Sequence, residues 1–156
     1  MLMQARNSGK TRRIGVANFT LPLLQQAVME FGAPLFCNQV EYHIMLSQKP
    51  VLDYARKHQM IATAYSPLGK GELVKHPMLV AIGEKHNKTA AQVALRWLIQ
   101  QDGVAAIPKS AREENMRRNF EIFDFELDAD DQQKITQLGS NNRLINPAWA
   151  PQWDAA

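Results

Sequence analysis

The sequence predicts an α/β fold in which parallel strands alternate with helices. Four short apolar runs stand out, at residues 12–17, 35–40, 60–66 and 103–108. They lack a clean alternation of polar and apolar residues, which is typical of strands buried on both faces. A helical pattern follows each run, and no hairpin turn signal joins one run to the next. Such alternation implies right-handed crossovers, in a doubly wound sheet or in part of a (β/α) barrel.

The first two strands are each followed by one helix. After 12–17 we expect a helix over 21–31, which Gly32 ends as a C-cap. Its apolar face would carry Leu21, Leu24, Val28 and Phe31. After 35–40 we expect a helix over 48–58, which tolerates Pro50 because a proline costs little in the first turn.

The third strand is followed by two helices, over 77–86 and 90–101. The second opens with the segment "TAAQ", which has the spacing of a capping box. Its buried stripe would be formed by Ala90, Val93, Ala94, Trp97 and Leu98.

The fourth strand is followed by a helix over 111–120. Here the segment "SARE" predicts a second capping box, and Met116, Phe120 and Phe123 form the apolar side. A last helix over 128–138 precedes an irregular C-terminal tail, residues 140–156.

Glycine-rich motifs bear on the choice between a doubly wound sheet and a barrel. A doubly wound nucleotide fold usually carries G-x-G-x-x-G or G-x-x-x-x-G-K-[ST] in its first turn, and the sequence has neither. Barrels instead bind phosphate after their last strands, at a helix N-terminus. The barrel is therefore the favoured interpretation.

Composition indicates one soluble domain over residues 1–156, 46% hydrophobic and 21% charged. No signal peptide or membrane-length apolar run is visible, and the single cysteine, Cys37, favours a reducing compartment. We expect a cytoplasmic protein. The net charge is only +3 and no long basic stripe with interleaved aromatic residues occurs, so an anionic small molecule is a better partner than nucleic acid.

Polar and aromatic residues stand where the strands end, which is where parallel barrels bind ligands. These are Asn18, then Asn38 and Gln39, then Tyr65 and Ser66, then Lys109 and Ser110. Amide side chains could hold a planar amide-bearing ligand, and the Tyr65 ring could stack on it. The alternative is that the amides merely cap strand ends.

The segment "IPKSAREENMRRN" brings several cations to the start of the 111–120 helix. Free backbone N–H groups, the helix dipole, Lys109 and Arg112 would together make a phosphate site. In the structural alternative, Ser110 and Glu113 are reciprocal caps and the arginines are solvated. Glu41 and His43 have no third ligand at a suitable spacing, so a metal site is not expected.

Five segments occur in the order and spacing typical of the aldo-keto reductases: "GKTRRIGVANF", "NQVEYH", "AYSPLGKG", "TAAQVALRW" and "IPKSAREENMRRN". The tail, "NRLINPAWAPQWD", resembles that of small bacterial members that reduce diketogluconate or methylglyoxal. The resemblance implies a (β/α)₈ barrel of which this chain is the C-terminal half, (β/α)₄ with an extra helix and tail. It also implies the cofactor NADP(H) and a small carbonyl substrate.

The resemblance assigns cofactor contacts residue by residue. Asn18 and Gln39 match the pair that holds the nicotinamide carboxamide, and Tyr65 matches the ring that stacks on the nicotinamide. The other matches are Ser66, Leu68 and Gly69 along the pyrophosphate, Lys109 and Ser110 at the 2′-phosphate, and Asn119 at adenine.

Two positions depart from the family pattern. Ala17 stands where a serine is usual, and Asn115 stands where many members have the arginine that faces the 2′-phosphate. Arg112 or Arg118 could substitute for that arginine.

The catalytic Asp, Tyr, Lys and His of the family belong to the first half of its barrel. The resemblance therefore implies a cofactor-binding half that is inactive alone, with Trp149 in a tail that lines the substrate pocket. The alternative is a non-catalytic half-barrel binding module. Open edges at the first and last strands predict a homodimer or a complementing N-terminal half.

Overall fold

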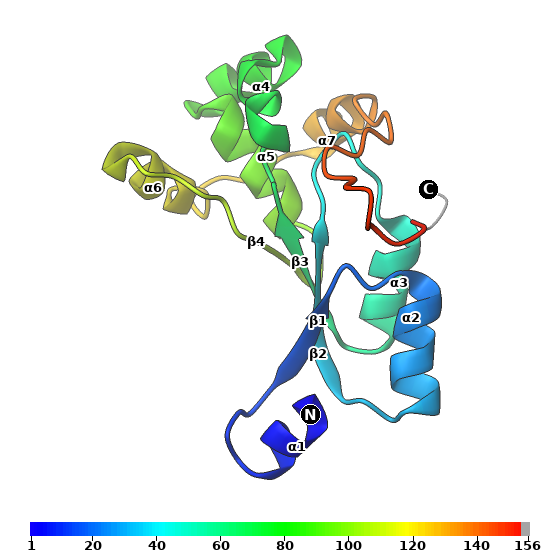
Figure 1. The fold of residues 1–156 in the computed structure, drawn as a ribbon. Coiled ribbons are helices and arrows are strands. Elements are labelled where there is room, and N and C mark those ends of the chain that lie inside the picture. The colour runs from blue at the N-terminus through cyan, green and yellow to red at the C-terminus, as the bar shows by residue number, and fades with distance from the viewer. Residues whose placement is uncertain (154–156) are drawn as a thin grey trace.

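The computed structural model describes residues 1–153 and contains one four-stranded sheet. Its strands are β1 (Ile14–Ala17), β2 (Leu35–Glu41), β3 (Ile61–Tyr65) and β4 (Val104–Ala106). They pair in the order β1-β2-β3-β4, and every pairing is parallel (Figure 1). The predicted α/β class, the four strands and their neighbour pairing are confirmed.

The helices after the first two strands lie where they were expected. The segment 21–31 forms α2 (Leu21–Gln25) and then a π-helix, η1 (Gln26–Glu30), and β2 is followed by α3 (Lys49–Lys57). Because the wider π turn changes the angular spacing of side chains, the expected single apolar face is not kept. Leu24 is fully buried, whereas Phe31 is 65% exposed.

The second half contains the remaining helical elements. Two short 3-10 turns, η2 (Gly69–Gly71) and η3 (Leu73–Lys75), precede α4 (Pro77–His86) and α5 (Ala90–Ile99). The predicted capping box at the start of α5 is confirmed, because Thr89 and Gln92 cap each other. After β4 come α6 (Glu113–Phe120) and α7 (Ala129–Thr136). An N-terminal helix, α1 (Leu2–Asn7), was not expected from the sequence.

The segment around α6 corrects two expectations. The helix begins two residues later than expected, with Arg112 as N-cap, and no side-chain capping bond forms there within residues 1–153. The Ser110 hydroxyl instead accepts a hydrogen bond from the Arg112 N–H at 3.1 Å. The predicted apolar side of this helix is exposed, at 45% for Met116 and 78% for Phe120, because α6 stands away from the sheet (Figure 1).

The core lies on one face of the sheet. On β3, Ala62 and Ala64 are buried against α3 and α5 residues such as Val51 and Leu98, whereas Thr63 on the opposite face is only half-buried. The expectation of strands buried on both faces is therefore met on one face only. A second apolar cluster joins α4, α5 and α7, and Trp97 packs against both clusters. No helix among residues 1–153 is long and apolar enough to cross a membrane.

Helix α7 is attached to α4 by ionic contacts. The Lys85 ammonium contacts Asp128 at 2.6 Å and Asp131 at 2.9 Å, and the His86 ring lies 2.7 Å from the other Asp131 oxygen. The hydrogen bond from Lys85 lowers the pKa of Asp128 to about 2. Burial opposes the shift at Asp131, yet contacts with His86 and Lys85 leave the pKa of that carboxyl below its usual value.

Acid is expected to weaken this attachment. A carboxyl whose pKa is lower in the folded state stabilises the fold above its unfolded pKa and loses that contribution as the pH falls through the folded value. We therefore expect the thermal midpoint to fall between about pH 4 and pH 2, from the ordinary value of 3.8 to the lowered value of about 2. Asp128→Asn, which keeps a good N-cap, should show a shallower fall. Equal slopes for the two proteins would contradict this assignment.

Candidate functional site

Three of the expected site residues meet at the carboxyl ends of β1, β2 and β3. Gln39 lies between Ala17 and Thr63 in the sheet register. Asn18 follows β1 with a left-handed φ of 57°, which asparagine tolerates better than most residues. Burial and the charge of Glu41 raise the pKa of Tyr65, so its hydroxyl remains protonated and donates to Asn18 Oδ1 at 3.1 Å.

Asn38 has a structural role instead. Its side chain is fully buried, donates to the Phe19 carbonyl at 2.9 Å and accepts from the Phe19 N–H at 3.4 Å. These two bonds hold the turn that follows β1. The alternative interpretation, that an amide caps a strand end, is thus correct for Asn38. The side chain of Gln39 is half-buried and makes no such hydrogen bonds within the described residues.

The loop after β3 is a tight turn with four residues of positive φ. Ser66, Gly69, Lys70 and Gly71 have φ values of 49°, 56°, 51° and 96°. The Gly69 N–H donates to the Ser66 carbonyl at 2.9 Å, and the Gly71 N–H donates to the Leu68 carbonyl at 3.0 Å. A Cβ at position 69 would lie 2.7 Å from the end of Met45, so both space and conformation favour glycine.

A pocket of about 250 Å³ brings together the sites predicted after β3 and after β4. Its wall includes Leu68 from the loop after β3, Lys109 and Ser110 from the segment after β4, and Arg118 and Asn119 from α6. Asn115, Val74, Thr89 and Ala91 complete it. The last three were not predicted, and the only sequence signal among them, Thr89, indicated a helix cap.

The cations of α6 are arranged differently from the expectation. Arg117 and Arg118 lie in the last turn rather than at the helix start, and they pair with Glu113 and Glu114 one turn earlier. The prediction that cations crowd the helix N-terminus is therefore wrong for these two residues. Arg118 nevertheless lines the pocket, whereas Arg112 does not.

The C-terminal tail has no helix or strand over residues 140–153, and residues 154–156 of the expected tail lie outside the described residues. Trp149 is 83% exposed. The Trp153 ring instead folds back within the tail, with its Nε1 2.8 Å from Asn146 Oδ1. The two tryptophans thus differ, because one is presented outward and the other holds the tail to itself.

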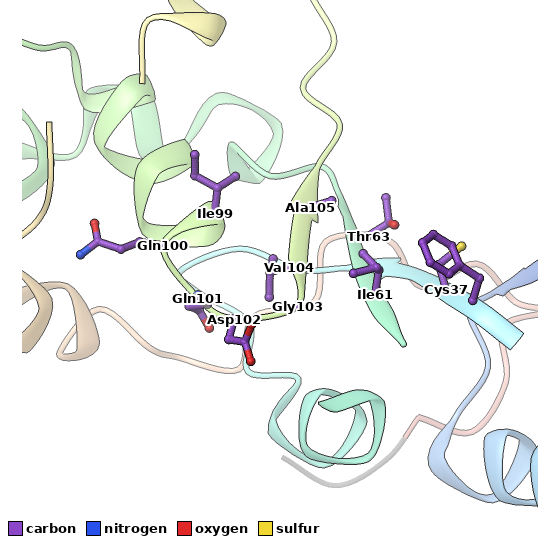
Figure 2. Close-up of a pocket in the computed structure, with 11 residues that line it drawn as sticks. Cys37, Ile61, Thr63, Ile99, Gln100, Gln101, Asp102, Gly103, Val104 and Ala105 are labelled. Atoms are coloured by element: carbon purple, nitrogen blue, oxygen red, sulfur yellow. The ribbon is translucent and has the colours of Figure 1, made fainter. Parts of the chain in front are cut away.

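The half-buried face of the sheet forms a separate cavity of about 760 Å³ near the amino ends of the strands. Figure 2 shows Cys37, Ile61 and Thr63 on β2 and β3 beside Ala105 on β4. Gly15 on β1 makes room for the thiol, because a Cβ there would lie 2.4 Å from Cys37 Sγ. This cavity is distinct from the polar residues at the carboxyl ends.

Known proteins of similar sequence cover most of this chain. The profile of the Aldo/keto reductase family matches residues 1–140. The chain is 37% identical over 155 residues to methylglyoxal reductase DkgB of Escherichia coli O157:H7, covering 98% of this chain and 58% of that protein. It is 43% identical over 136 residues to glyoxal reductase of Bacillus subtilis (strain 168), covering 87% of this chain and 49% of that protein.

Solved structures of similar sequence superimpose on this chain. A candidate 2,5-diketo-D-gluconic acid reductase B superimposes with a TM-score of 0.95 at 44% identity, covering 99% of this chain and 56% of its own. The Gox0644 D53A mutant in complex with NADPH superimposes with a TM-score of 0.84 at 36% identity, covering 88% and 51%. The chain therefore spans about half the length of the relatives that it matches.

Proposed function

Because the chain belongs to the aldo/keto reductase family, we propose that it is the cofactor-holding part of an NADPH-dependent reductase of aldehydes and ketones. The observation that carries the proposal is the pocket shared by Leu68, Lys109, Ser110, Arg118 and Asn119. Two cations and four uncharged hydrogen-bonding side chains line it, and no carboxylate of the described chain does so. Such a pocket suits a phosphate next to a purine ring.

Each residue of the site then has a role toward the cofactor. Asn18 and Gln39 would hold the nicotinamide carboxamide, and Tyr65, whose hydroxyl is engaged by Asn18, would stack its ring on the nicotinamide. Ser66, Leu68 and Gly69 would follow the pyrophosphate, Lys109, Ser110 and Arg118 the 2′-phosphate, and Asn119 the adenine. Arg112 is a peripheral cation, outside the pocket wall. Trp149 would face the carbonyl substrate.

The chain would supply only part of the chemistry. NADPH delivers a hydride to the carbonyl carbon, and the resulting alkoxide needs a proton from a donor aimed at it. We assign that donor to the other half of a (β/α)₈ barrel, of which this chain is the C-terminal half. The chain would act as one domain in the cytoplasm, as a homodimer or with a complementing N-terminal half. Packing of Trp97 against both apolar clusters supports the single domain.

Fluorescence titration with NADPH, together with an assay on methylglyoxal and phenylglyoxal, tests this function. We expect the isolated chain to bind NADPH weakly and to reduce neither aldehyde, because the proposal places the phosphate pocket on this chain and the proton donor on the other half of the barrel. Failure to bind NADPH at millimolar concentration would overturn the proposal. Measurable turnover would contradict the assignment of the donor to another part of the barrel.

A non-catalytic binding module is the second candidate, and the open face of the sheet favours it. The cavity lined by Cys37, Ile61 and Thr63 is half-apolar and could hold a ligand without any chemistry. In that case NADPH would not bind at the carboxyl ends of the strands. The same titration therefore distinguishes the two functions.

A further inference from the structure

A buried carboxylate binds two neighbouring backbone amides of the C-terminal tail. Glu41, the last residue of β2, has no exposed surface. Its Oε1 accepts the Leu144 N–H at 2.8 Å, and its Oε2 accepts the Ile145 N–H at 3.0 Å. The His43 ring lies beside the same carboxylate, with Nε2 3.0 Å from Oε1, and Arg143 Nη1 lies 4.0 Å from Oε2. Two backbone groups from more than 100 residues away thus bind one side chain.

The segment that contains these two amides makes several contacts within itself. We call residues 143–153 the tail loop. The Arg143 guanidinium lies 3.8 Å from the centre of the Trp153 ring, and the Trp153 indole contacts Asn146 at 2.8 Å. The Ala150 N–H donates to the Pro147 carbonyl at 2.8 Å, so the middle of the loop is a turn with Trp149 on its outside. These contacts define the shape of the tail loop, and its position relative to the sheet depends on its base, residues 144 and 145.

Glu41 is better suited to fix residues 144 and 145 than the exposed contact beside it is. An ionised carboxylate only accepts hydrogen bonds, and a buried one is costly unless its oxygens are paired. Earlier in the tail, the Asn142 N–H donates to the Met45 carbonyl at 2.8 Å and holds residue 142. At Leu144 itself, the carbonyl accepts a hydrogen bond from the exposed Lys70 ammonium at 2.9 Å. Such an exposed contact contributes little, because water competes for both groups.

Glu41 also lies beside the expected nicotinamide platform. It pairs with Tyr65 in the sheet register, and its charge contributes to the raised pKa of that tyrosine, after burial. One carboxylate is thus in reach of both the tail loop and the ring on which the cofactor would stack.

We propose that Glu41 is a positioning residue that holds Leu144 and Ile145 at the strand ends and so sets where the tail loop presents Trp149. The functional part, that Trp149 faces the carbonyl substrate, rests on the proposed function above. The positioning part concerns this chain alone, and it is measurable without cofactor or turnover.

Amide hydrogen exchange of the full chain, followed by NMR, tests the positioning. In the wild type we expect the Leu144 and Ile145 amides to exchange at least tenfold more slowly than the Trp149 amide. Glu41→Gln places an N–H₂ group where one of the two acceptors stood, so at least one of the two amides should lose that protection while the β2 amides keep theirs. Lys70→Met, which removes the exposed contact to Leu144, is the matched control and should change protection less than twofold.

Two further variants separate positioning from general support of the fold. Glu41→Asp keeps a charged double acceptor and is expected to recover part of the protection. Leu144→Pro removes one donor without touching the buried carboxylate, and it should speed exchange at Ile145 even where Glu41→Gln fails to fold. Fast exchange of Leu144 and Ile145 in the wild type, or unchanged protection in a folded Glu41→Gln chain, would overturn the proposal. Normal protection without NADPH binding would count against the proposed function only.

Discussion

Replacing Lys109 and Arg118 by alanine is expected to weaken binding of 2′,5′-ADP by about a hundredfold. Hydrogen bonds to charged groups contribute about 1.5–3 kcal/mol each, and both side chains are exposed, so we take the lower limit, about tenfold for each residue. Lys109 precedes α6 and Arg118 lies in its last turn, and the expected hundredfold loss is the limit in which the two single losses add. Isothermal titration of the wild type and the double variant measures the effect.

The structure provides two controls for this experiment. Arg112→Ala removes a cation from the same segment, but one that is outside the pocket wall, and should change the affinity less than twofold. 5′-AMP lacks the 2′-phosphate, so its affinity should be nearly the same for the wild type and the double variant. An equal loss for both nucleotides, or a comparable loss in Arg112→Ala, would place the phosphate elsewhere. The experiment thus decides whether Arg112 or Arg118 contacts the 2′-phosphate in place of the arginine that Asn115 replaces.

Sedimentation equilibrium at micromolar concentration is expected to show a species of twice the chain mass. Strands β1 and β4 are the two edges of the sheet, and each leaves one row of backbone groups unpaired by the other described strands. Apolar side chains gather beside β1, where Val16, Phe19, Leu23 and Phe31 line a cavity of about 480 Å³. A two-fold dimer with β1 of one chain beside β4 of the other would cover these edges.

A charge on the open face of the sheet should prevent this association. Thr63 lies on that face, beside the cavity shown in Figure 2, so Thr63→Lys would place an ammonium between the two copies without entering the helix-covered core. Thr136→Lys, on the exposed side of α7, makes the same chemical change away from the sheet and should leave the mass unchanged. The Cys37 thiol gives an independent measure, because closure of the sheet should slow its reaction with a thiol reagent.

Other outcomes of this experiment are equally informative. A compact wild-type monomer with a sharp unfolding transition would contradict the argument from the open edges. The N-terminal half of the barrel can be produced separately and added to the dimer. If a heterodimer then replaces the homodimer, that half is the preferred partner.

Local patterns in the sequence were sufficient for the four strands, for the positions of the main helices between and after them, and for the order of the sheet. Apolar runs of strand length, separated by helical segments, predict parallel neighbours because crossovers of one hand leave few other arrangements. The bounds of α4 and the capping box at Thr89 were also predictable, since a cap depends on residues three positions apart. The amide and aromatic residues at the strand ends followed from the same logic.

Tertiary structure decided which of these residues share a site. Whether Arg112 or Arg118 reaches the pocket depends on where α6 begins and how it is turned, and the absence of a Ser110–Glu113 cap among the described residues changed both. Asn38 and Gln39 are neighbours in sequence, yet a strand sends them to opposite faces, where one locks a turn and the other is available. The contact of Glu41 with Leu144 and Ile145 had no local signal, because hydrogen bonds between residues so far apart in sequence exist only once the sheet and the tail are in place.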